Sequence, residues 1–441
     1  MNKKDIHELK RRLTKHGCTF TRMCGCYVDG EHNKVTNIAE TFLNLEEEDF
    51  FKYLDIAKKV FSGTVGNNIL ELEFPLEEEA VGGKQQFLMG LRESGLKNDE
   101  LLEAFYDMVI ESYSHAGNYL ILLFHDAYDV MKKTKDNIDL DESEEVYDYL
   151  ICAICPVNLT KPGLGYREEE NCIRSRIRDW VVGLPDTGFV FPAFTERSTD
   201  IHSVMFYTRD TKNPHSEFMT DGLGCGVKLT AAEKKMTFEN IVKDVIGDEG
   251  GKSEVLYMDI QDNLNDRVCQ HMEMNDPEEG RGEQEPMLLT TREISEVLTE
   301  SGLSEEQTAA IEKNYEDVFG EDLPEAGSLV DARLVEANAR RKDRLELVQQ
   351  VSSLKQQLEE IRSFPGSSSE KPEEGVSADP ENPEDSLQDD MEYGAEEDCD
   401  IILHVKPEKE QQIYSQIIDG KKCLVIPMEE DENAAVNGKS L

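Results

Sequence analysis

The sequence predicts an α+β fold built on a largely antiparallel sheet, and two observations lead to this prediction. β-like segments come in hairpin-like pairs separated by single helices, whereas a doubly wound parallel sheet requires strict alternation of strands and helices. Two segments, 119–125 and 146–157, are continuous apolar runs of strand length, rich in residues that favour strands. In chain order, the predicted strands span residues 18–28, 34–38, 119–125, 146–157, 189–194 and 201–209.

Helices are predicted where apolar residues recur every three or four positions. In the first part of the chain they cover an N-terminal segment with Ile6, Leu9 and Leu13 inward, and residues 45–61, 99–113, 168–182 and 231–246. Three helices begin at capping boxes, formed by Thr230 with Glu233, Thr290 with Glu293, and Ser304 with Gln307. Asn44, three residues before Glu47, is a further candidate cap. The helix at 168–182 is predicted from the stripe Ile173, Ile177 and Trp180.

These elements divide the chain into a main α+β domain, residues 1–275, and a series of smaller parts. A polar linker leads to a small helical unit, 287–322, and then to an amphipathic helix, 329–362. Within 363–400, fourteen acidic residues stand against one basic residue, so this tract cannot bury enough apolar surface to become ordered. The remaining predicted parts are an acidic disordered linker at 363–398, a short C-terminal β-α-β-β piece at 399–428 that docks on the rest of the chain, and a disordered tail at 429–441.

The chain carries 47 basic and 93 acidic residues, a formal net charge of −46. Such a surface repels nucleic-acid phosphates and anionic lipids, so we expect neither nucleic acid nor a membrane as partner. The sequence contains no run of about 18 apolar residues, and its cationic N-terminal segment lacks the apolar middle part of a signal peptide. We therefore expect a cytoplasmic protein whose partners are other proteins or a small molecule, and nothing in the sequence indicates a cofactor.

Four of the ten cysteines, Cys24, Cys26, Cys152 and Cys155, have spacings that zinc sites use. Cys152 and Cys155 lie in an apolar β-like run, however, and residues three apart in a strand face opposite sides of a sheet. The main interpretation is therefore buried structural thiols, with no metal. A zinc ion shared by the four thiols is the alternative.

The densest basic patch in this acidic chain includes Arg174 and Arg178, and Arg197 and Arg209 follow not far along the sequence. Forked guanidinium groups suit phosphate and carboxylate ligands. Arg174, Arg178 and Arg197 are therefore candidate anion-binding residues. The alternative is a solvated helix face, because Glu170, Arg174 and Arg178 would form i, i+4 ion pairs on a helix.

Candidate catalytic residues are His125 and Asp126 at the end of one predicted strand, and Asp200 and His202 at the start of another, with Glu196 close by. Polar groups at the ends of buried strands are suited to acid–base chemistry. The sequence contains no nucleophile elbow, Walker loop, HExxH motif or dinucleotide fingerprint to accompany them. These residues are therefore weak candidates.

The helix at 329–362 carries an apolar stripe with heptad spacing. Its members are Leu347, Val351, Leu354, Leu358 and Ile361. A stripe of about two heptads is marginal for an independent coiled coil. It predicts either a homodimer through 347–361 or docking of the helix along its own chain.

Several short motifs are spread over the chain. They are CGCYVDG at 24–30, LEFPL at 72–76, ICAICPVN at 151–158, KPG at 161–163, RDW at 178–180, FPAF at 191–194, RSTDIH at 197–202 and IDGKKCLVIP at 418–427. In combination they resemble a family described only as a domain of unknown function, found mainly in anaerobic Gram-positive bacteria. The resemblance covers most of 1–335 and 399–428, and the segment 337–398 departs from the usual form and is interpreted as an insertion. It implies no known activity.

Two functions follow from these observations. The leading hypothesis is a non-enzymatic cytoplasmic binding or adaptor protein, because no catalytic motif is present and the added helix and acidic tract suit contact with a partner. The alternative is an enzyme or sensor for a small anionic metabolite that bears phosphate or carboxylate. That alternative uses Arg178, Arg197, Asp200 and His202.

Overall fold

A computed structural model describes residues 2–133, 139–168, 171–247, 252–274, 286–320 and 322–363, and four short C-terminal segments, 414–418, 421–425, 435–436 and 439–440. The chain forms two compact units, Met1–Ile361 and Arg362–Leu441. Most of the predicted acidic linker, and the strand and helical turn expected at 401–407, lie outside the described residues.

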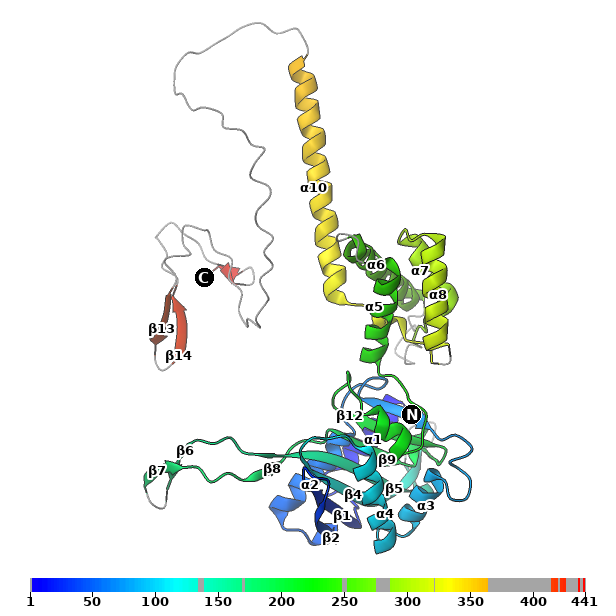
Figure 1. Ribbon diagram of the computed structural model, residues 1–441, viewed down its shortest axis with the longest axis vertical. Coiled ribbons are helices and arrows are strands. Elements are labelled where there is room, and N and C mark those ends of the chain that lie inside the picture. Colours follow the sequence, from blue (N-terminus) through cyan, green and yellow to red (C-terminus); the bar gives the residue numbers. More distant parts are fainter. Residues whose placement is uncertain are drawn as a thin grey trace. The chain divides into compact units, whose positions relative to one another are not determined.

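The first unit contains an eight-stranded sheet with the order β2-β1-β4-β5-β9-β12-β3, in which β8 also pairs with β5 (Figure 1). Every pair in this sheet is antiparallel, which confirms the predicted α+β class. The sequence did not predict β3. The strands are β1 (Arg22–Val28), β2 (Lys34–Glu40), β3 (Ile69–Glu73), β4 (Asn118–Lys133), β5 (Asp139–Leu159), β8 (Trp180–Val182), β9 (Thr187–Phe191) and β12 (Ser203–Thr208).

Both faces of the sheet are covered, which explains why β4 and β5 read as continuous apolar runs. One face packs against α3 (Lys84–Glu93) and α4 (Asp99–Ser112) in a core that includes Leu91, Phe105 and Ile121. The other face packs against α1 (Lys3–Arg12) and α2 (Glu47–Val60) in a second core that includes Leu9, Leu54 and Leu122. Ile121 and Leu122 are neighbours that enter different cores, as strand geometry requires.

A third core belongs to helices of the first unit that follow the sheet. They are α5 (Ala231–Ile246), α6 (Lys252–Met274), α7 (Thr291–Glu300), α8 (Glu305–Phe319) and α9 (Ala326–Leu329). The capping boxes predicted at Thr230, Thr290 and Ser304 are all present. The predicted cap of α2 is wrong, because Asn44 ends a short 3-10 turn, η1 (Phe42–Asn44), and α2 begins after Glu46 without a side-chain cap.

The long helix α10 (Ala332–Ser363) covers most of the segment 329–362 for which a helix is predicted, whereas Leu329 ends α9. Its first turns are tied to α6 through the buried Asn338, whose amide donates hydrogen bonds to Asp259 and Asp262 at 3.0 and 2.5 Å. Arg341 and Lys342 add ion pairs to the same two carboxylates. α10 is therefore anchored near its N-terminus by residues that α6 supplies.

The helix predicted at 168–182 is wrong. The structure places β6 (Leu164–Arg167) and β7 (Cys172–Ser175) there as an antiparallel pair, followed by β8. β8 forms because β5 pairs with it, a contact that the local sequence does not reveal. We call residues 160–168 and 171–182 the arm, and Figure 1 shows β6 and β7 at its far end, beyond β8 and away from the rest of the eight-stranded sheet.

The second unit is described only in its short strands. β13 (Tyr414–Ile418) and β14 (Lys421–Val425) form an antiparallel pair, as predicted from the turn residues between them. β15 (Ala435–Val436) and β16 (Lys439–Ser440) pair within the segment for which the sequence predicts a disordered tail. Across the described residues of the chain, no helix combines the length and apolarity that a membrane span requires.

Candidate functional site

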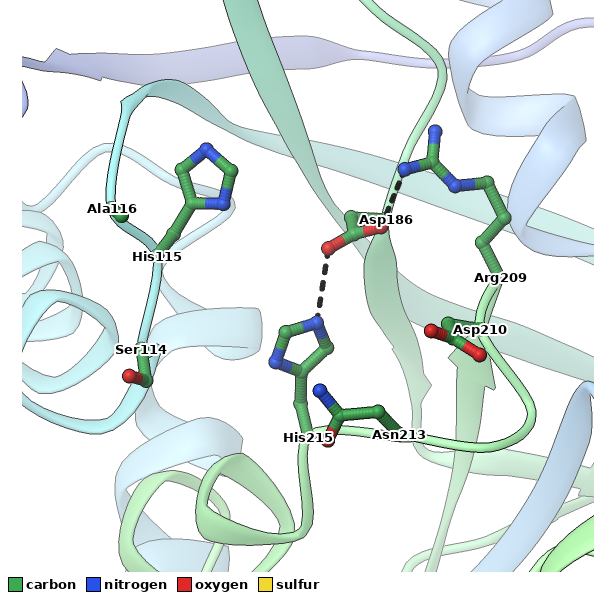
Figure 2. Close-up of a pocket in the computed structure, with 8 residues that line it drawn as sticks. All are labelled: Ser114, His115, Ala116, Asp186, Arg209, Asp210, Asn213 and His215. Carbon is green, nitrogen blue, oxygen red and sulfur yellow. Dashed lines mark hydrogen bonds and ion pairs between the residues drawn. The ribbon is translucent and has the colours of Figure 1, made fainter.

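A polar pocket of about 520 Å³ opens at one end of strands β9 and β12 (Figure 2). Because Thr187 of β9 pairs with Thr208 of β12, the residue before one strand lies beside the residue after the other. These two residues are Asp186 and Arg209, and the backbone N–H of Arg209 donates to the Asp186 carbonyl at 2.8 Å. The full lining is Ser114, His115, Ala116, Asp186, Arg209, Asp210, Asn213 and His215.

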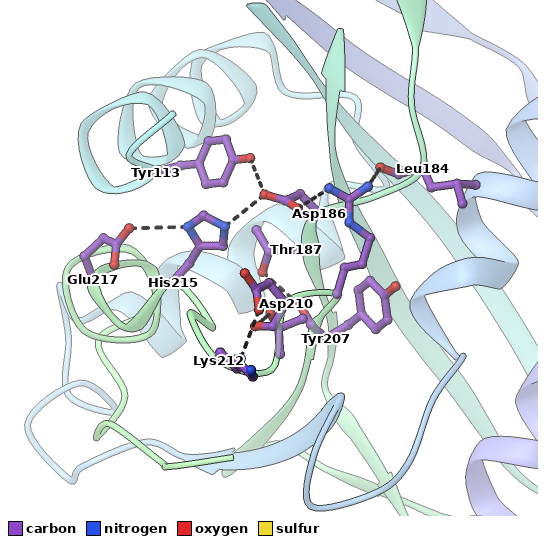
Figure 3. A network of polar contacts seen from close by, with 11 residues as sticks. Tyr113, Leu184, Asp186, Thr187, Tyr207, Asp210, Lys212, His215 and Glu217 are labelled. Carbon is purple, nitrogen blue, oxygen red and sulfur yellow. Dashed lines mark hydrogen bonds and ion pairs between the residues drawn. The ribbon is translucent and has the colours of Figure 1, made fainter. Parts of the chain in front are cut away.

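The Asp186 carboxylate is the centre of the polar network around this pocket (Figure 3). It accepts a hydrogen bond from the Tyr113 hydroxyl at 3.1 Å, and lies 2.9 Å from Nε2 of His215 and 2.7 Å from Nη2 of Arg209. The hydrogen bond from His215 lowers the pKa of Asp186 to about 2, against the opposing effect of burial, and the charges of His215 and Arg209 add to the decrease. Three of the roughly four acceptor sites of the Asp186 carboxylate are therefore occupied.

His215 is largely buried between two carboxylates. Its side chain is 10% exposed, with Nε2 facing Asp186 and Nδ1 facing Glu217 at 3.4 Å. Burial acts to lower the pKa of His215, but hydrogen bonds and charges from Asp186 and Glu217 outweigh burial, so that the pKa is raised. Both ring nitrogens face carboxylates, which suits the doubly protonated imidazolium and leaves no lone pair for a general base. The backbone of His215 has φ +60, a left-handed conformation unusual for a residue with a side chain.

His115 has a different environment from His215. Its ring stacks on Tyr113 with an interplanar angle of 13°, and it makes no hydrogen bond within the described part of the chain. Burial lowers the pKa of His115, with the nearby Asp186 charge opposing that effect. His115 is therefore a neutral imidazole at neutral pH, and Figure 2 shows it on the side of the pocket opposite Arg209.

The candidate catalytic residues from the sequence lie in two separate places. His125 is on β4, with Nε2 2.8 Å from Asp148, and Asp126 is fully buried. His202 lies 2.7 Å from Glu79, and its backbone N–H donates to Asp200. Strands β5 and β9 stand between β4 and β12, so the sheet order does not bring the two pairs together.

The hydrogen bonds of Asp126 hold parts of the fold together. Its carboxylate accepts hydrogen bonds from Tyr149 and Thr19, both at 2.6 Å, and from Arg12 at 3.3 Å. This set joins α1 and the following loop to β4 and β5. A fully buried carboxylate requires such partners. Asp126 thereby ties the N-terminal helix to the sheet.

The candidate anion-binding arginines are also divided between two places. Arg174 and Arg178 are on the arm, where Nε of Arg178 donates to the carbonyl of Thr160 at 2.8 Å. Arg197, at the turn between β10 (Ala193–Thr195) and β11 (Ser198–Asp200), pairs with Glu8 of α1 at 3.0 Å. Glu196 precedes it, and both residues have positive φ. The helix prediction at 168–182 placed the arm arginines on a surface that does not form.

The four cysteines with zinc-like spacing are buried. Cys24, Cys26 and Cys152 belong to the core on one face of the sheet, and Cys155 belongs to the core on the other face. Cys152 and Cys155 therefore face opposite sides of the sheet, as strand geometry requires. Within the described residues, no group of three or more histidine, cysteine or acidic side chains is arranged to hold a metal ion.

Sequence reasoning missed Asp186 and His215 as site residues and mentioned Arg209 only as a neighbour of other arginines. A signal was present, because Arg209 ends the predicted strand 201–209 and Asp186 lies shortly before the predicted strand 189–194, and a hairpin-like connection would place these strands side by side. His215 had no such signal. It lies in an irregular loop, and only the folded chain brings it to Asp186.

The arm is a second notable surface. Ile173, Ile177 and Trp180 are 70%, 69% and 55% exposed, and every described residue from 173 to 182 is exposed. Arg174, Arg176 and Arg178 alternate with these apolar residues along the sequence. The arm therefore presents apolar and basic side chains together on an otherwise acidic protein.

Comparison with known proteins places the chain in a family. No curated protein sequence matches it. The model of the family described as a domain of unknown function (DUF4317) matches residues 1–439, nearly the whole chain. The protein therefore belongs to this family of unknown function.

Proposed function

We propose that the pocket beside Asp186 binds a small organic anion bearing phosphate or carboxylate groups. The observation that carries the proposal is the position of Arg209. Its side chain is 46% exposed at the pocket, yet Asp186 and the carbonyl of Leu184 hold the guanidinium in place. A pre-positioned, half-exposed guanidinium loses little conformational entropy when it binds an anion.

The charges around Arg209 support the same ligand class. Asp186 is occupied by three donors, so it competes weakly with an incoming anion for the outer edge of Arg209. The raised pKa of His215 favours its cationic form at the pocket wall, whereas the exposed Asp210 carboxylate in the lining opposes an anion. Asn213 and His115 are neutral groups that can donate hydrogen bonds from the remaining sides. A volume of about 520 Å³ exceeds that of an inorganic ion and suits an organic anion.

Of the two pocket histidines, only His115 has a ring nitrogen open to proton transfer. An enzymatic reaction in this pocket would therefore use His115 as acid or base, with His215 held between Asp186 and Glu217. Binding without turnover, as in a sensor, needs only the cationic and donor groups. The proposed binding function is the same whether the bound anion is turned over or only bound.

The test is a thermal-shift titration of the full chain with inorganic phosphate, pyrophosphate and citrate, each against sodium chloride at the same ionic strength. Arg209→Gln removes the guanidinium. Arg292→Gln is the matched control, because Arg292 is 89% exposed and pairs with Glu296 four residues along its own helix. We expect an anion-specific rise in Tm that Arg209→Gln abolishes and Arg292→Gln retains. A rise that persists in Arg209→Gln would contradict the proposal.

Protein docking through the arm is a second candidate function, and it corresponds to an adaptor. A two-stranded ribbon alone is only marginally stable in water, so a surface that covers Ile177 and Trp180 would stabilise it. The arginines interleaved with these residues favour a partner with an acidic surface.

The adaptor proposal is tested by quantitative co-purification from a lysate. The double variant Ile177→Ser, Trp180→Ser is compared with the wild type and with Val81→Ser, a control at a fully exposed valine. We expect a defined partner to be lost only with the double variant and to be released at high salt, since paired surface charges are screened. Recovery that is equal for all three proteins would rule out docking through the arm.

A further inference from the structure

Two opposite charges line the polar pocket without pairing with each other. The guanidinium of Arg209 contacts Asp186 and the carbonyl of Leu184. The carboxylate of Asp210, the next residue, accepts a hydrogen bond from the backbone N–H of Lys212 at 3.0 Å, and in the described part of the chain it takes part in no ion pair. Figure 2 shows Arg209 and Asp210 on the same side of the pocket. Each charge is therefore open to a ligand group of the opposite sign.

The turn after β12 holds Asp210 in position. The hydroxyl of Thr208 and the backbone N–H of Asn213 donate to the carbonyl of Asp210 at 3.0 and 3.3 Å, and the Lys212 N–H holds Oδ1 of its side chain (Figure 3). A carboxylate has roughly four acceptor sites, and this contact uses one of them. Asp210 thus offers a pre-positioned acceptor at the pocket, as Arg209 offers a pre-positioned donor.

A ligand with negative charge alone matches only half of this lining. Its anionic group gains hydrogen bonds from Arg209 but is repelled by Asp210. A ligand that also carries an ammonium group satisfies both residues, since the ammonium donates to the Asp210 carboxylate. Such a ligand has little net charge, so the overall charge of −46 on the chain does not repel it from a distance.

We propose that this pocket takes a zwitterion of the α-amino acid type, whose carboxylate binds Arg209 and whose ammonium binds Asp210. The proposal rests on the anion-binding function proposed above and narrows its ligand class. In an α-amino acid the two charged groups are attached to one carbon, and in the protein the two complementary charges belong to consecutive residues. The opposite charges are therefore close together in both partners.

The rest of the lining indicates what the amino acid side chain is like. Ser114 and Asn213 contribute neutral polar groups, and Ala116 is the apolar residue among the lining residues. A large apolar side chain would find little apolar surface to cover in this pocket. The ligand therefore has a small or polar side chain.

Pairs of ligands that differ only in the amine test the proposal. L-Serine is compared with 3-hydroxypropionate, and L-glutamate with glutarate, in thermal-shift titrations of the full chain at constant ionic strength, with citrate as an anion that has no amine. The wild type should bind each amino acid about tenfold more tightly than its amine-free counterpart, because a hydrogen bond between charged groups is lost with the amine.

Three variants assign the two charges. Asp210→Asn should bind both members of each pair alike and should bind citrate more tightly than the wild type, because the repelling carboxylate is gone. Arg209→Gln should bind none of these ligands. Asp317→Asn is the matched control, at an exposed aspartate of α8 outside the pocket lining, and should keep the wild-type preference for the amine.

The outcomes separate the zwitterion from the anion-binding function on which it rests. The zwitterion is overturned if the wild type binds citrate or glutarate as well as the amino acids, or if Asp210→Asn keeps the preference for the amine. Anion binding still stands in those cases if Arg209→Gln abolishes the binding of citrate and glutarate. A wild type that binds none of the ligands, or binding that survives in Arg209→Gln, would contradict both proposals.

Discussion

Nε2 of His215 lies 2.9 Å from Oδ2 of Asp186, although 29 positions separate the two residues in the chain. The contact joins the loop before the short π-helical segment η2 (Phe218–Gly222) to the start of β9. Both side chains are largely buried, at 10% and 14% exposure. The pair therefore fixes one wall of the pocket and also contributes to the stability of the sheet edge.

Removal of the Asp186 charge should destabilise the fold. Asp186→Asn leaves His215 and Arg209 beside an amide, and breaking a largely buried ion pair costs about 3 kcal/mol. Asp210→Asn, at an exposed carboxylate of the same pocket, should cost less than about 1 kcal/mol. Urea unfolding followed by circular dichroism measures both. Equal losses of unfolding free energy in the two variants would show that the network adds no stability.

The stability that His215 provides should depend on pH in a defined window. Its pKa is raised above the ordinary 6.5, so its contribution is complete below 6.5 and is lost as the pH rises through the folded-state pKa. The pKa of Asp186 is lowered from 3.8 to about 2, so its contribution is complete above 3.8 and is lost as the pH falls towards 2. The difference in unfolding free energy between the wild type and His215→Asn should thus be largest between these two limits. Asparagine is chosen because it tolerates the positive φ at this position. A difference that grows above neutral pH would contradict the assigned charges.

Anion affinity should increase on acidification because of His115. Burial holds the pKa of His115 below 6.5, so the ring is neutral at pH 7 and becomes a cation only at lower pH. Protonation adds a positive charge to the pocket, and pyrophosphate should bind more tightly as the pH falls through that pKa. Calorimetric titrations of the wild type and His115→Gln measure this increase, which should be absent in the variant. If both proteins show the same pH profile, His115 does not contact the anion.

Trp180 is the only tryptophan in the chain and gives a direct optical report on the arm. Because the side chain is 55% exposed, its emission should be that of a solvated indole, and acrylamide should quench it efficiently in the folded protein. Urea should change the emission maximum only slightly. A blue-shifted, protected tryptophan in the free protein would mean that the arm is already covered. The same signal should shift to the blue when an arm-binding partner is added.

The buried thiols should be unreactive until the protein unfolds. Burial raises the pKa of Cys26 to about 11 and that of Cys155 to about 12, so both remain protonated at neutral pH. Cys269 is exposed and should be alkylated before these buried thiols. Brief treatment with iodoacetamide followed by peptide mass spectrometry tests this order. Rapid labelling of Cys155 in the folded protein would exclude the buried environment described for it, and one equivalent of zinc in protein purified without chelator would revive the metal alternative.

The predictions that succeeded depended on contacts between residues close in the sequence. Capping boxes such as Thr230 with Glu233 involve a single turn of helix, and the hairpin β1–β2 depends on a turn at Asp29 and Gly30. The opposite facing of Cys152 and Cys155 follows from the two-residue period of a strand. For these features the local chain contains all the physical information that is required.

The prediction for 168–182 failed because apolar spacing alone cannot tell whether a stripe will be buried. Ile173, Ile177 and Trp180 have helical spacing, yet their side chains contact solvent in an extended ribbon. The extended form is selected by backbone hydrogen bonds between β8 and β5, which lie about 20 residues apart in the chain. The candidate arginines on that segment were therefore placed on the wrong kind of surface.

By itself, the sequence determined the antiparallel α+β class, the capped helices of the helical core, the heptad spacing of the apolar stripe on α10 and the acidity of the chain. These properties depend on composition or on spacings of a few residues. Only the tertiary structure decided that Tyr113, Asp186, Arg209 and His215 meet in one network, and that α10 is anchored near its N-terminus while Leu347, Val351, Leu354 and Leu358 stay exposed. The physical reason is that polar side chains in loops have no periodic signal, and their partners are selected by how distant strands pair.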